Sequence, residues 1–456
     1  MILLFACAQP ANELAVSPAS GSATGYTEIE VSGVEGEVSR LWVDGVEAFG
    51  LSAAQGVTSA TWQGAPSSGP VTVSLEVDGV VLDFPEALVV NAPLDPVFAR
   101  VVGVGASFTM GVQNGVPSDH GSLASPGMLL AQNAGAFYAV PLLVPGLFPE
   151  IGVADLGAAP RCEIPDIVEF VSDASVDVIT TLADENGFAF APGRVTPDLM
   201  PRDLAVGGTQ VEVLAHGSDA FELNFVAHLV YDPYGGLGDS PPYSQLELAI
   251  AAEPTLALSF DLLGNDLIWS VVTERYLDPS KATPVDELRA PLEEVLAGLS
   301  ATGAEVFVAN MPDPTVLGAA RQKQALMVSE GLYTEDEAEA VAQQIRDLAV
   351  GYNVLLDSTA APYANVHVVD VASVVADVAA NGRELAGENV GITLLGGFIS
   401  FDGLHFSNTG YALLAETFVT AINSTLGTDV PPVDIEAIYA ADPMRLSALR
   451  AAGFDP

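Results

Sequence analysis

The feature that most constrains the fold is an alternation of strand-like and helix-like segments that begins near residue 97. Four largely apolar runs stand out: FARVVGV (98–104), TLALSFDLL (255–263), EVFVAN (305–310) and NVHVVDV (365–371). Strands that are apolar on both faces are typical of parallel sheets covered by helices. The alternation therefore predicts an α/β fold: a doubly wound, flavodoxin-like parallel sheet with helices on both faces.

Helix boundary signals lie between and after these runs. Thr283-Pro284 predicts the start of one helix, because proline suits the first helical position, and Gly303 predicts its end. Thr334 is followed by three acidic residues, which favour a helix N-terminus, so it predicts a second start. Ser407 precedes the last long apolar segment with helical spacing.

The first part of the chain has a different pattern. Apolar and polar residues alternate around Ile29 and Val73, as in strands with one buried face. Asp44-Gly45 and Asp78-Gly79 interrupt apolar runs, as hairpin turns do. Residues 13–92 are therefore predicted to form a small all-β sandwich domain. The run VSPASGSATGYTEIEVSG resembles the opening of an immunoglobulin-like IPT/TIG module.

Composition excludes several classes of protein. Lys and Arg number 14 and Asp and Glu number 59, so the formal net charge is −45. A field of that sign repels phosphate backbones, which excludes a nucleic-acid partner. Apolar residues nevertheless make up 50% of the chain, too many for a disordered acidic segment.

The N-terminal segment, residues 1–12, begins MILLFACAQP. Leu4-Phe5-Ala6-Cys7 resembles a bacterial lipobox, whose cysteine is acylated. We therefore expect an exported protein, either a cell-envelope lipoprotein anchored to the membrane through lipidated Cys7 or a secreted protein. An ordinary apolar N-terminus is the alternative. Cys162 is the other cysteine, and two cysteines do not make a disulfide framework.

Candidate site residues follow the strand-like runs, where ligands of doubly wound folds bind. Ser107, in GASFTMG, follows the first run and either presents its hydroxyl at the sheet edge or caps a helix. Asn265 follows the second run, and its amide suits either an oxyanion hole or an Asx turn. A turn with Gly208, or its neighbour Gly207, offers a further N–H donor.

Asp402 and His405 form the last block, in FDGLHF. A carboxylate three residues before a histidine can bond one ring nitrogen and leave the other free as a base. A serine nucleophile needs such a base, because its hydroxyl attacks poorly while protonated.

In this order the blocks resemble those of the SGNH or GDSL-type hydrolase family, over residues 97–425. The resemblance implies an ester hydrolase with a Ser107, His405 and Asp402 triad. It also implies an oxyanion hole made by Ser107, Gly208 and Asn265, with no cofactor and no metal. One position departs from the family pattern, because Ala106 stands where the family has aspartate before the serine. Residues 426–456 form a C-terminal extension that we expect to pack on this domain.

The resemblance leaves the substrate open. An esterase or lipase acting on a small-molecule or lipid ester is the first expectation. An O-deacetylase of acetylated polysaccharide is the second, and a non-catalytic surface binding protein is the third. The strong negative charge weighs against anionic phospholipid surfaces as the preferred substrate.

Overall fold

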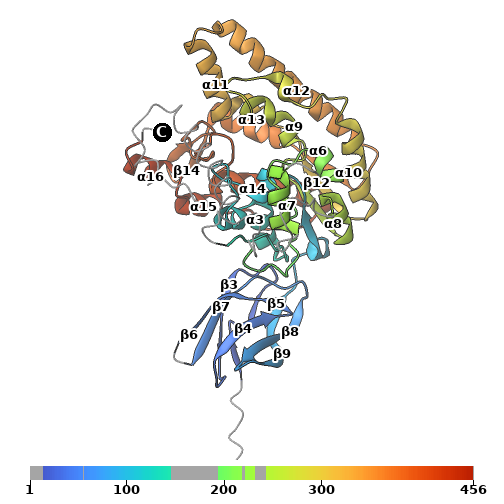
Figure 1. Ribbon diagram of the computed structural model, residues 1–456, viewed down its shortest axis with the longest axis vertical. Coiled ribbons are helices and arrows are strands. Elements are labelled where there is room, and N and C mark those ends of the chain that lie inside the picture. Colours follow the sequence, from blue (N-terminus) through green and yellow to red (C-terminus); the bar gives the residue numbers. More distant parts are fainter. Residues whose placement is uncertain (1–13, 55, 145–193, 218–220, 232–242, 455–456) are drawn as a thin grey trace, which may run out of the picture.

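The computed structural model describes residues 14–54, 56–144, 194–217, 221–231 and 243–454. A β-rich N-terminal region is followed by a larger α/β region that begins near residue 97 (Figure 1). The predicted fold class is therefore confirmed. Cys7 and Cys162 lie outside the described residues, so acylation of Cys7 stays a prediction.

The N-terminal region is a sandwich of two sheets. One sheet has the order β1 (Ala15–Ser17), β3 (Thr27–Ser32), β7 (Val57–Trp62), β6 (Phe49–Ala54). The other has the order β2 (Ser20–Ser22), β9 (Val80–Asn91), β8 (Gly69–Val77), β4 (Val38–Val43), β5 (Val46–Glu47). The alternation seen in the sequence buries one face of each main strand, and Ile29, Leu41 and Trp62 lie fully buried in the core.

The two Asp-Gly pairs form hairpin turns, as predicted. Asp44-Gly45 joins β4 to β5, and Asp78-Gly79 joins β8 to β9. All four residues have positive φ, at 52° and 79° in the first turn and 50° and 78° in the second. Positive φ at both central residues defines the type I′ turn, which matches the twist of an antiparallel pair.

The α/β region is built on a parallel sheet. Its strands are β10 (Val101–Gly103), β11 (Leu256–Ser259), β12 (Glu305–Ala309) and β13 (Val366–Val369), in that order. On the other side of β10, residues 202–206 run parallel to it, with the Gly103 N–H donating to the Arg202 carbonyl at 2.9 Å. Counting this segment as the second strand gives the order second, first, third, fourth, fifth, which is flavodoxin-like. The sequence did not predict a strand there.

Helices surround this sheet (Figure 1). The contacts between helices divide most of them into two groups. One group contains α3 (Pro126–Ala134), α13 (Val371–Asn381) and α14 (Asn408–Leu426). The other contains α6 (Val211–His216), α8 (Gln245–Ala251), α9 (Gly264–Val272), α10 (Arg289–Ala301) and α12 (Glu335–Ala360). α11 (Gly318–Ser329) lies against α12. The remaining elements are α1 (Ser107–Met110), α2 (Asp119–Leu123), α7 (Phe221–Tyr231), α15 (Ile435–Ala441), α16 (Leu446–Ala451), β14 (Arg383–Leu385), β15 (Glu388–Val390) and short 3-10 turns at Pro96–Ala99, Pro279–Lys281 and Pro314–Val316.

None of the helices in the described ranges is both long and apolar enough to cross a membrane.

Two of the predicted helix starts are confirmed and one is wrong. Thr334 caps α12 in a capping box with Glu337, and Ser407 caps α14. α10, however, begins at Arg289 and not at Thr283. The Thr283 hydroxyl donates to Asp266 Oδ1 at 3.0 Å and its N–H donates to the Asp266 carbonyl at 2.8 Å. Thr283 therefore ties its segment to α9 and does not cap a helix.

The sandwich is joined to the α/β region by buried hydrogen bonds. The Thr24 hydroxyl donates to the Ala136 carbonyl at 2.6 Å, and the Val140 N–H donates to the Tyr26 hydroxyl at 3.1 Å. Phe137 and Ala139 belong to the apolar core of the sandwich. The segment Ala136–Val140 thus contributes to both regions, which argues against a loosely tethered spacer.

The C-terminal extension packs on the α/β region, as expected. Buried Asp442, just after α15, accepts hydrogen bonds from the N–H and the hydroxyl of Thr409 at 2.9 and 2.6 Å. These bonds hold the extension to the first turn of α14.

Candidate active site

Ser107 is the first residue of α1, directly after the turn that ends β10. Ala106 occupies the N-cap position and makes no side-chain capping bond, so Ser107 is not the capping serine that the sequence left open. Gly105 has a φ of 146°, and a Cβ there would lie 2.5 Å from Asp261 Oδ1. Only glycine fits this close approach. The turn therefore carries Ser107 at the carboxyl end of a central strand.

The glycine turn predicted as an oxyanion donor lies beside Ser107. Thr209 closes it, with its N–H donating to the Val206 carbonyl at 3.2 Å. Gly208 has a φ of 86°, the left-handed value that the third residue of a type II turn requires. A Cβ on Gly207 would lie 3.9 Å from the Ser107 Cβ, so the turn and the serine are in close contact.

Asn265 is bonded to the same turn. It is the second residue of α9 and 6% exposed, and its amide donates to the Thr209 carbonyl at 3.0 Å. Its side-chain oxygen accepts no backbone N–H within the described residues, so no local Asx turn forms there. An amide has two N–H bonds. The second makes no hydrogen bond within the described part of the chain and remains available to a ligand.

Asp402 and His405 are bonded to each other, with 2.6 Å between Asp402 Oδ2 and His405 Nδ1. The other carboxylate oxygen accepts hydrogen bonds from the Ser400 hydroxyl and from the N–H groups of Leu404 and His405, each at 2.9 Å. Burial acts to raise the pKa of Asp402, but the charge and hydrogen bond of the His405 ring and the N–H groups of Leu404 and His405 outweigh it and lower the pKa to about 2. Asp402 is therefore ionised at neutral pH.

Contacts between loops bring His405 to the Ser107 helix. The Phe108 ring meets the His405 ring edge-on, with 5.7 Å between their centroids. The Asn114 N–H donates to the Ser400 hydroxyl at 3.1 Å, and the Phe401 N–H donates to the Asn114 side chain at 2.8 Å. These bonds join the segment after α1 to the Asp-x-x-His loop.

The free nitrogen of His405 is available for chemistry. His405 is 8% exposed, and within the described residues its Nε2 makes no hydrogen bond, to Ser107 or to any other group. In unliganded sites the bond between nucleophile and base is often loose and shortens only with substrate bound. The structure thus places the predicted site residues near one another, without a hydrogen bond between Ser107 and His405.

One polar residue of the site was not predicted from the sequence. Asp261, two residues after β11, accepts hydrogen bonds from the N–H groups of Ala106 and Phe108 at 2.9 and 2.7 Å. It is 8% exposed. A carboxylate directly after an apolar strand was the available signal, since such a residue lies at the sheet edge that carries the site.

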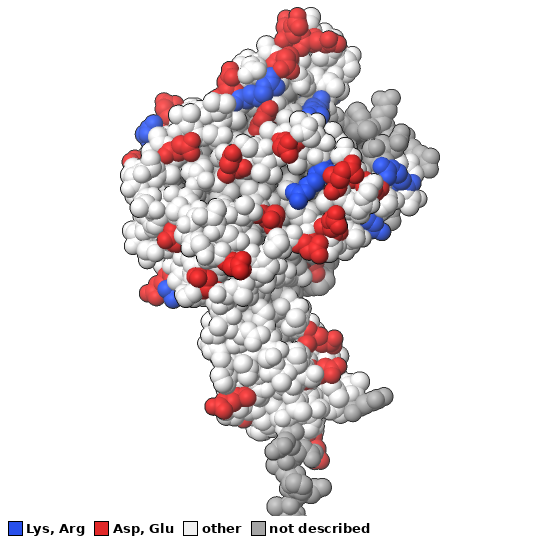
Figure 2. All heavy atoms as spheres, turned by 180° about the vertical axis from the view of Figure 1, so that it is seen from behind, with Lys and Arg blue, Asp and Glu red and all other residues white. Residues whose placement is uncertain are grey.

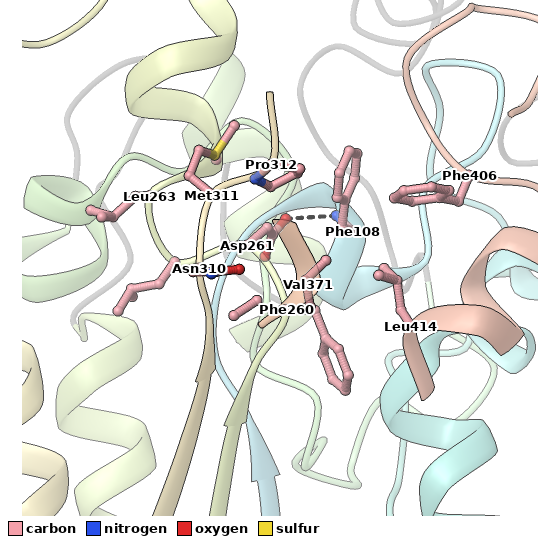
Figure 3. Close-up of a pocket in the computed structure, with 13 residues that line it drawn as sticks. Phe108, Phe260, Asp261, Leu263, Asn310, Met311, Pro312, Val371, Phe406 and Leu414 are labelled. Carbon is pink, nitrogen blue, oxygen red and sulfur yellow. Dashed lines mark hydrogen bonds between the residues drawn. The ribbon is translucent and has the colours of Figure 1, made fainter. Parts of the chain in front are cut away.

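An apolar pocket of about 30 Å³ lies beside the candidate site residues (Figure 3). Three of its lining residues are chain neighbours of site residues: Phe108 follows Ser107, Gly264 precedes Asn265, and Phe406 follows His405. Leu263, Met311, Pro312, Val371 and Leu414 complete most of its apolar wall. The pocket is therefore next to Ser107, Asn265 and His405.

The ranges that the structure describes contain no group of three or more His, Cys, Asp or Glu residues that could hold a metal ion.

The strand order defines a doubly wound α/β fold, and Ser107, Asn265 and the Asp402–His405 pair lie at or after the ends of its strands. The model of the GDSL-like lipase/acylhydrolase family matches residues 101–418, which is more than half of the chain. The chain belongs to this family, as the sequence predicted, and is a hydrolase that acts on esters.

Comparisons with individual proteins say less about this chain than the family model does. No curated protein matches the chain. Among solved structures, one similar chain is a carbohydrate acetylesterase from Xanthomonas citri. It is 10% identical, the alignment covers 88% of this chain and 72% of that one, and the TM-score is 0.26. A superposition this poor says nothing about the substrate of the present chain.

Proposed function

We propose that this protein is an exported serine esterase that cleaves carboxylic esters of short acyl groups. The observation that carries the proposal is the state of His405: its Nδ1 is bonded to ionised Asp402 while its Nε2 is unbonded, within the described residues, beside the Ser107 helix. Export and acylation of Cys7 rest on the sequence of the N-terminal segment alone.

The proposed reaction passes through an acyl-enzyme. Ser107 Oγ attacks the ester carbonyl carbon while His405 Nε2 takes the hydroxyl proton. Asp402 accepts the Nδ1–H bond and stabilises the imidazolium ion. His405 then gives the proton to the departing alkoxide oxygen. Water, deprotonated by the same nitrogen, then attacks the acyl carbon. As the bond from that carbon to Ser107 Oγ breaks, His405 returns the proton to Oγ, and the carboxylic acid leaves.

The negative charge that forms on the carbonyl oxygen needs donors. The Ser107 N–H, the Gly208 N–H and the second Asn265 amide N–H are the proposed set. Two observations support it: the Gly207-Gly208 turn contacts Ser107, and Asn265 is bonded to that turn through Thr209. Donors fixed in this way need no rearrangement when the charge develops.

The pocket supports a short, apolar acyl group. Its polar lining groups are already paired: Asp261 with the Ser107 turn, and Asn310 with the Asp370 side chain and the Ala372 N–H at 2.9 and 2.7 Å. An occupant therefore meets mainly apolar walls. One water needs roughly 10–15 Å³ by the same measure. A pocket of about 30 Å³ suits an acetyl or propionyl group better than a long chain.

Deacetylation of carbohydrate is the second candidate, and the small size of the pocket favours it. An acetyl group fills such a pocket whatever alcohol carries it. A lipase, in contrast, needs room for a long acyl chain. The net charge of −45 also favours a neutral polysaccharide over an anionic phospholipid surface.

Labelling with a fluorophosphonate tests the proposal. This reagent phosphonylates a serine that an adjacent base activates. We expect one label per molecule, found on the peptide that contains Ser107 by mass spectrometry, and no label in the Ser107→Ala variant. If the folded parent protein takes no label, it is not a serine hydrolase, and a non-catalytic binding protein becomes the better interpretation.

A substrate panel then separates the two candidates. p-Nitrophenyl esters of acetate, butyrate, octanoate and palmitate vary the acyl group, and acetylated xylan supplies a carbohydrate alcohol. We expect kcat/KM to be highest for acetate and to fall with chain length. Release of acetate from xylan supports the deacetylase, whereas a maximum at octanoate or palmitate contradicts the short acyl pocket.

A further inference from the structure

The turn that carries Ser107 is held by a carboxylate that lies two residues after the neighbouring strand, β11. Asp261 Oδ1 accepts the Ala106 N–H at 2.9 Å and the Thr109 hydroxyl at 2.6 Å, and Oδ2 accepts the Phe108 N–H at 2.7 Å. Figure 3 shows the Asp261 carboxylate bonded to the backbone of Phe108. The two backbone donors are the residues on either side of Ser107.

The N–H of Ser107 itself is left out of this set. It makes no hydrogen bond within the described residues, although both neighbouring N–H groups point to Asp261. A carboxylate that binds the two flanking N–H groups fixes the peptide planes around the serine. The Ser107 N–H is then held in a fixed position but is not one of the groups bonded to Asp261.

The surroundings of Asp261 fit the carboxylate closely. A Cβ on Gly105 would lie 2.5 Å from its Oδ1, and one on Gly264 would lie 3.1 Å from its Cβ. No Lys, Arg or His forms an ion pair with it in the part of the chain that is described. Burial raises the pKa of Asp261, and the donors from the Ser107 turn act against that rise. These donors are therefore its main partners.

We propose that Asp261 is the positioning residue of the nucleophile turn and orients the Ser107 N–H as an oxyanion donor, at a turn where Ala106 offers no carboxylate. This inference rests on the proposed function, because it assigns a part in catalysis by Ser107. The carboxylate comes from the segment after β11, and the turn itself has none.

The test is the Asp261→Asn variant, assayed with p-nitrophenyl acetate. An amide presents one acceptor and one N–H₂ donor, so at least one of the three donors of the turn meets another donor. Misplacement of a reacting group by about 1 Å costs up to roughly 100-fold in rate. We expect kcat to fall about 10- to 100-fold, KM to change less than about 3-fold, and fluorophosphonate labelling of Ser107 to slow by the same factor as kcat.

A matched control separates positioning from loss of stability. Asp442→Asn removes another buried carboxylate that accepts an N–H and a hydroxyl at the start of a helix, but Asp442 is bonded to none of the site residues. It should keep the parental kcat even if its melting temperature falls. Asp261→Ser, which is smaller and cannot overpack, replaces the Asn variant if that variant does not fold.

The outcomes are distinct. If the parent neither hydrolyses the ester nor takes the label, the proposed function fails. If the parent is active and a folded Asp261 variant keeps the parental kcat and labelling rate, the positioning role is wrong. Loss of kcat in the Asp442→Asn control by the same factor also contradicts it, because the effect would then follow from general destabilisation.

Discussion

The Asn265 side-chain amide has two N–H bonds with different proposed roles, so removing the side chain should lower kcat. One N–H holds the Gly208 turn through Thr209, and the other is the proposed oxyanion donor. Removing a single oxyanion donor typically lowers kcat by about 10²- to 10³-fold. Asn265→Ala should fall in this range on p-nitrophenyl acetate, with a much smaller change in KM.

The control for this prediction is Asn365→Ala. The Asn365 amide also donates to backbone carbonyls, those of Ser300 and Ala304 at 3.1 and 2.7 Å, but these lie at the end of α10 and just before β12, and the amide contacts no site residue. Its kcat should stay at the parental value. Equal losses of kcat in the two variants would argue against a specific role for Asn265.

Asp203 predicts a pH dependence of stability. It is fully buried beside β10, and burial raises its pKa to about 8, with Asp261 adding to the rise and the Ala205 N–H opposing it. In the folded protein the Asp203 carboxyl thus stays protonated between about pH 4 and pH 8, whereas in the unfolded chain it loses its proton in this range. The free energy of unfolding should therefore fall as pH rises through this window, by at most about 1.4 kcal/mol per pH unit from this group.

Asp203→Asn removes this contribution. The free energy of unfolding in urea, measured for the variant minus that of the parent, should increase steadily from pH 5 to pH 8. Curves for parent and variant that run parallel over the whole range would show that Asp203 is already ionised in the folded protein.

Several site residues lie in turns. The backbone conformation of the Gly208 turn can be tested by substitution with alanine. The φ of 86° is in the left-handed region, which costs a residue with a Cβ about 1–2 kcal/mol. Gly427, which ends α14, has a φ of 70°, and a Cβ placed there would meet nothing within 4 Å. Alanine should therefore cost both sites a similar amount of stability, as measured by urea unfolding.

Only the Gly208 variant should also lose activity. Straining that turn moves the Gly208 N–H and the Thr209 carbonyl that holds Asn265, so kcat should fall at least about 10-fold in Gly208→Ala and stay unchanged in Gly427→Ala. An unchanged kcat in both variants would remove Gly208 from the oxyanion hole.

The sequence predicted most strands of the parallel sheet and most candidate site residues, but it missed one strand and Asp261. The apolar runs predicted β10 to β13, and the strand ends led to Ser107, Asn265, Asp402 and His405, because local pattern and chain order carry that information. The segment 202–206 was missed because it is short, contains charged residues and is recognised by its pairing with Gly103. Asp261 was missed for a related reason: its three donors come from residues more than 150 positions away.

The molecule as a whole joins the sandwich and the hydrolase region through a shared buried segment. The Tyr26 hydroxyl accepts the Val140 N–H at 3.1 Å, and burial raises the pKa of Tyr26 to about 12. Tyr26→Phe leaves that N–H without its partner, which should cost about 1–3 kcal/mol of unfolding free energy. Tyr333, 38% exposed between α11 and α12, provides the control, and Tyr333→Phe should cost nothing measurable. Equal stability of the two variants would mean that the two regions are only loosely joined.

Surface charge sets the kind of substrate that can approach. Figure 2 shows Asp and Glu spread over one face of the α/β region, where they outnumber the Lys and Arg side chains that lie among them. The proposed chemistry uses one histidine and no lysine or arginine, so the shortage of basic residues does not limit it. The same surface repels anionic substrates at low ionic strength, which agrees with a neutral ester.

Hydrolysis of p-nitrophenyl acetate by Ser107→Ala tests most directly whether Ser107 is the nucleophile of an ester hydrolase. We predict saturable hydrolysis by the parent protein and no rate above that of buffer for the variant, with the circular dichroism spectra unchanged. A folded Ser107→Ala protein that hydrolyses the ester as fast as the parent would contradict it.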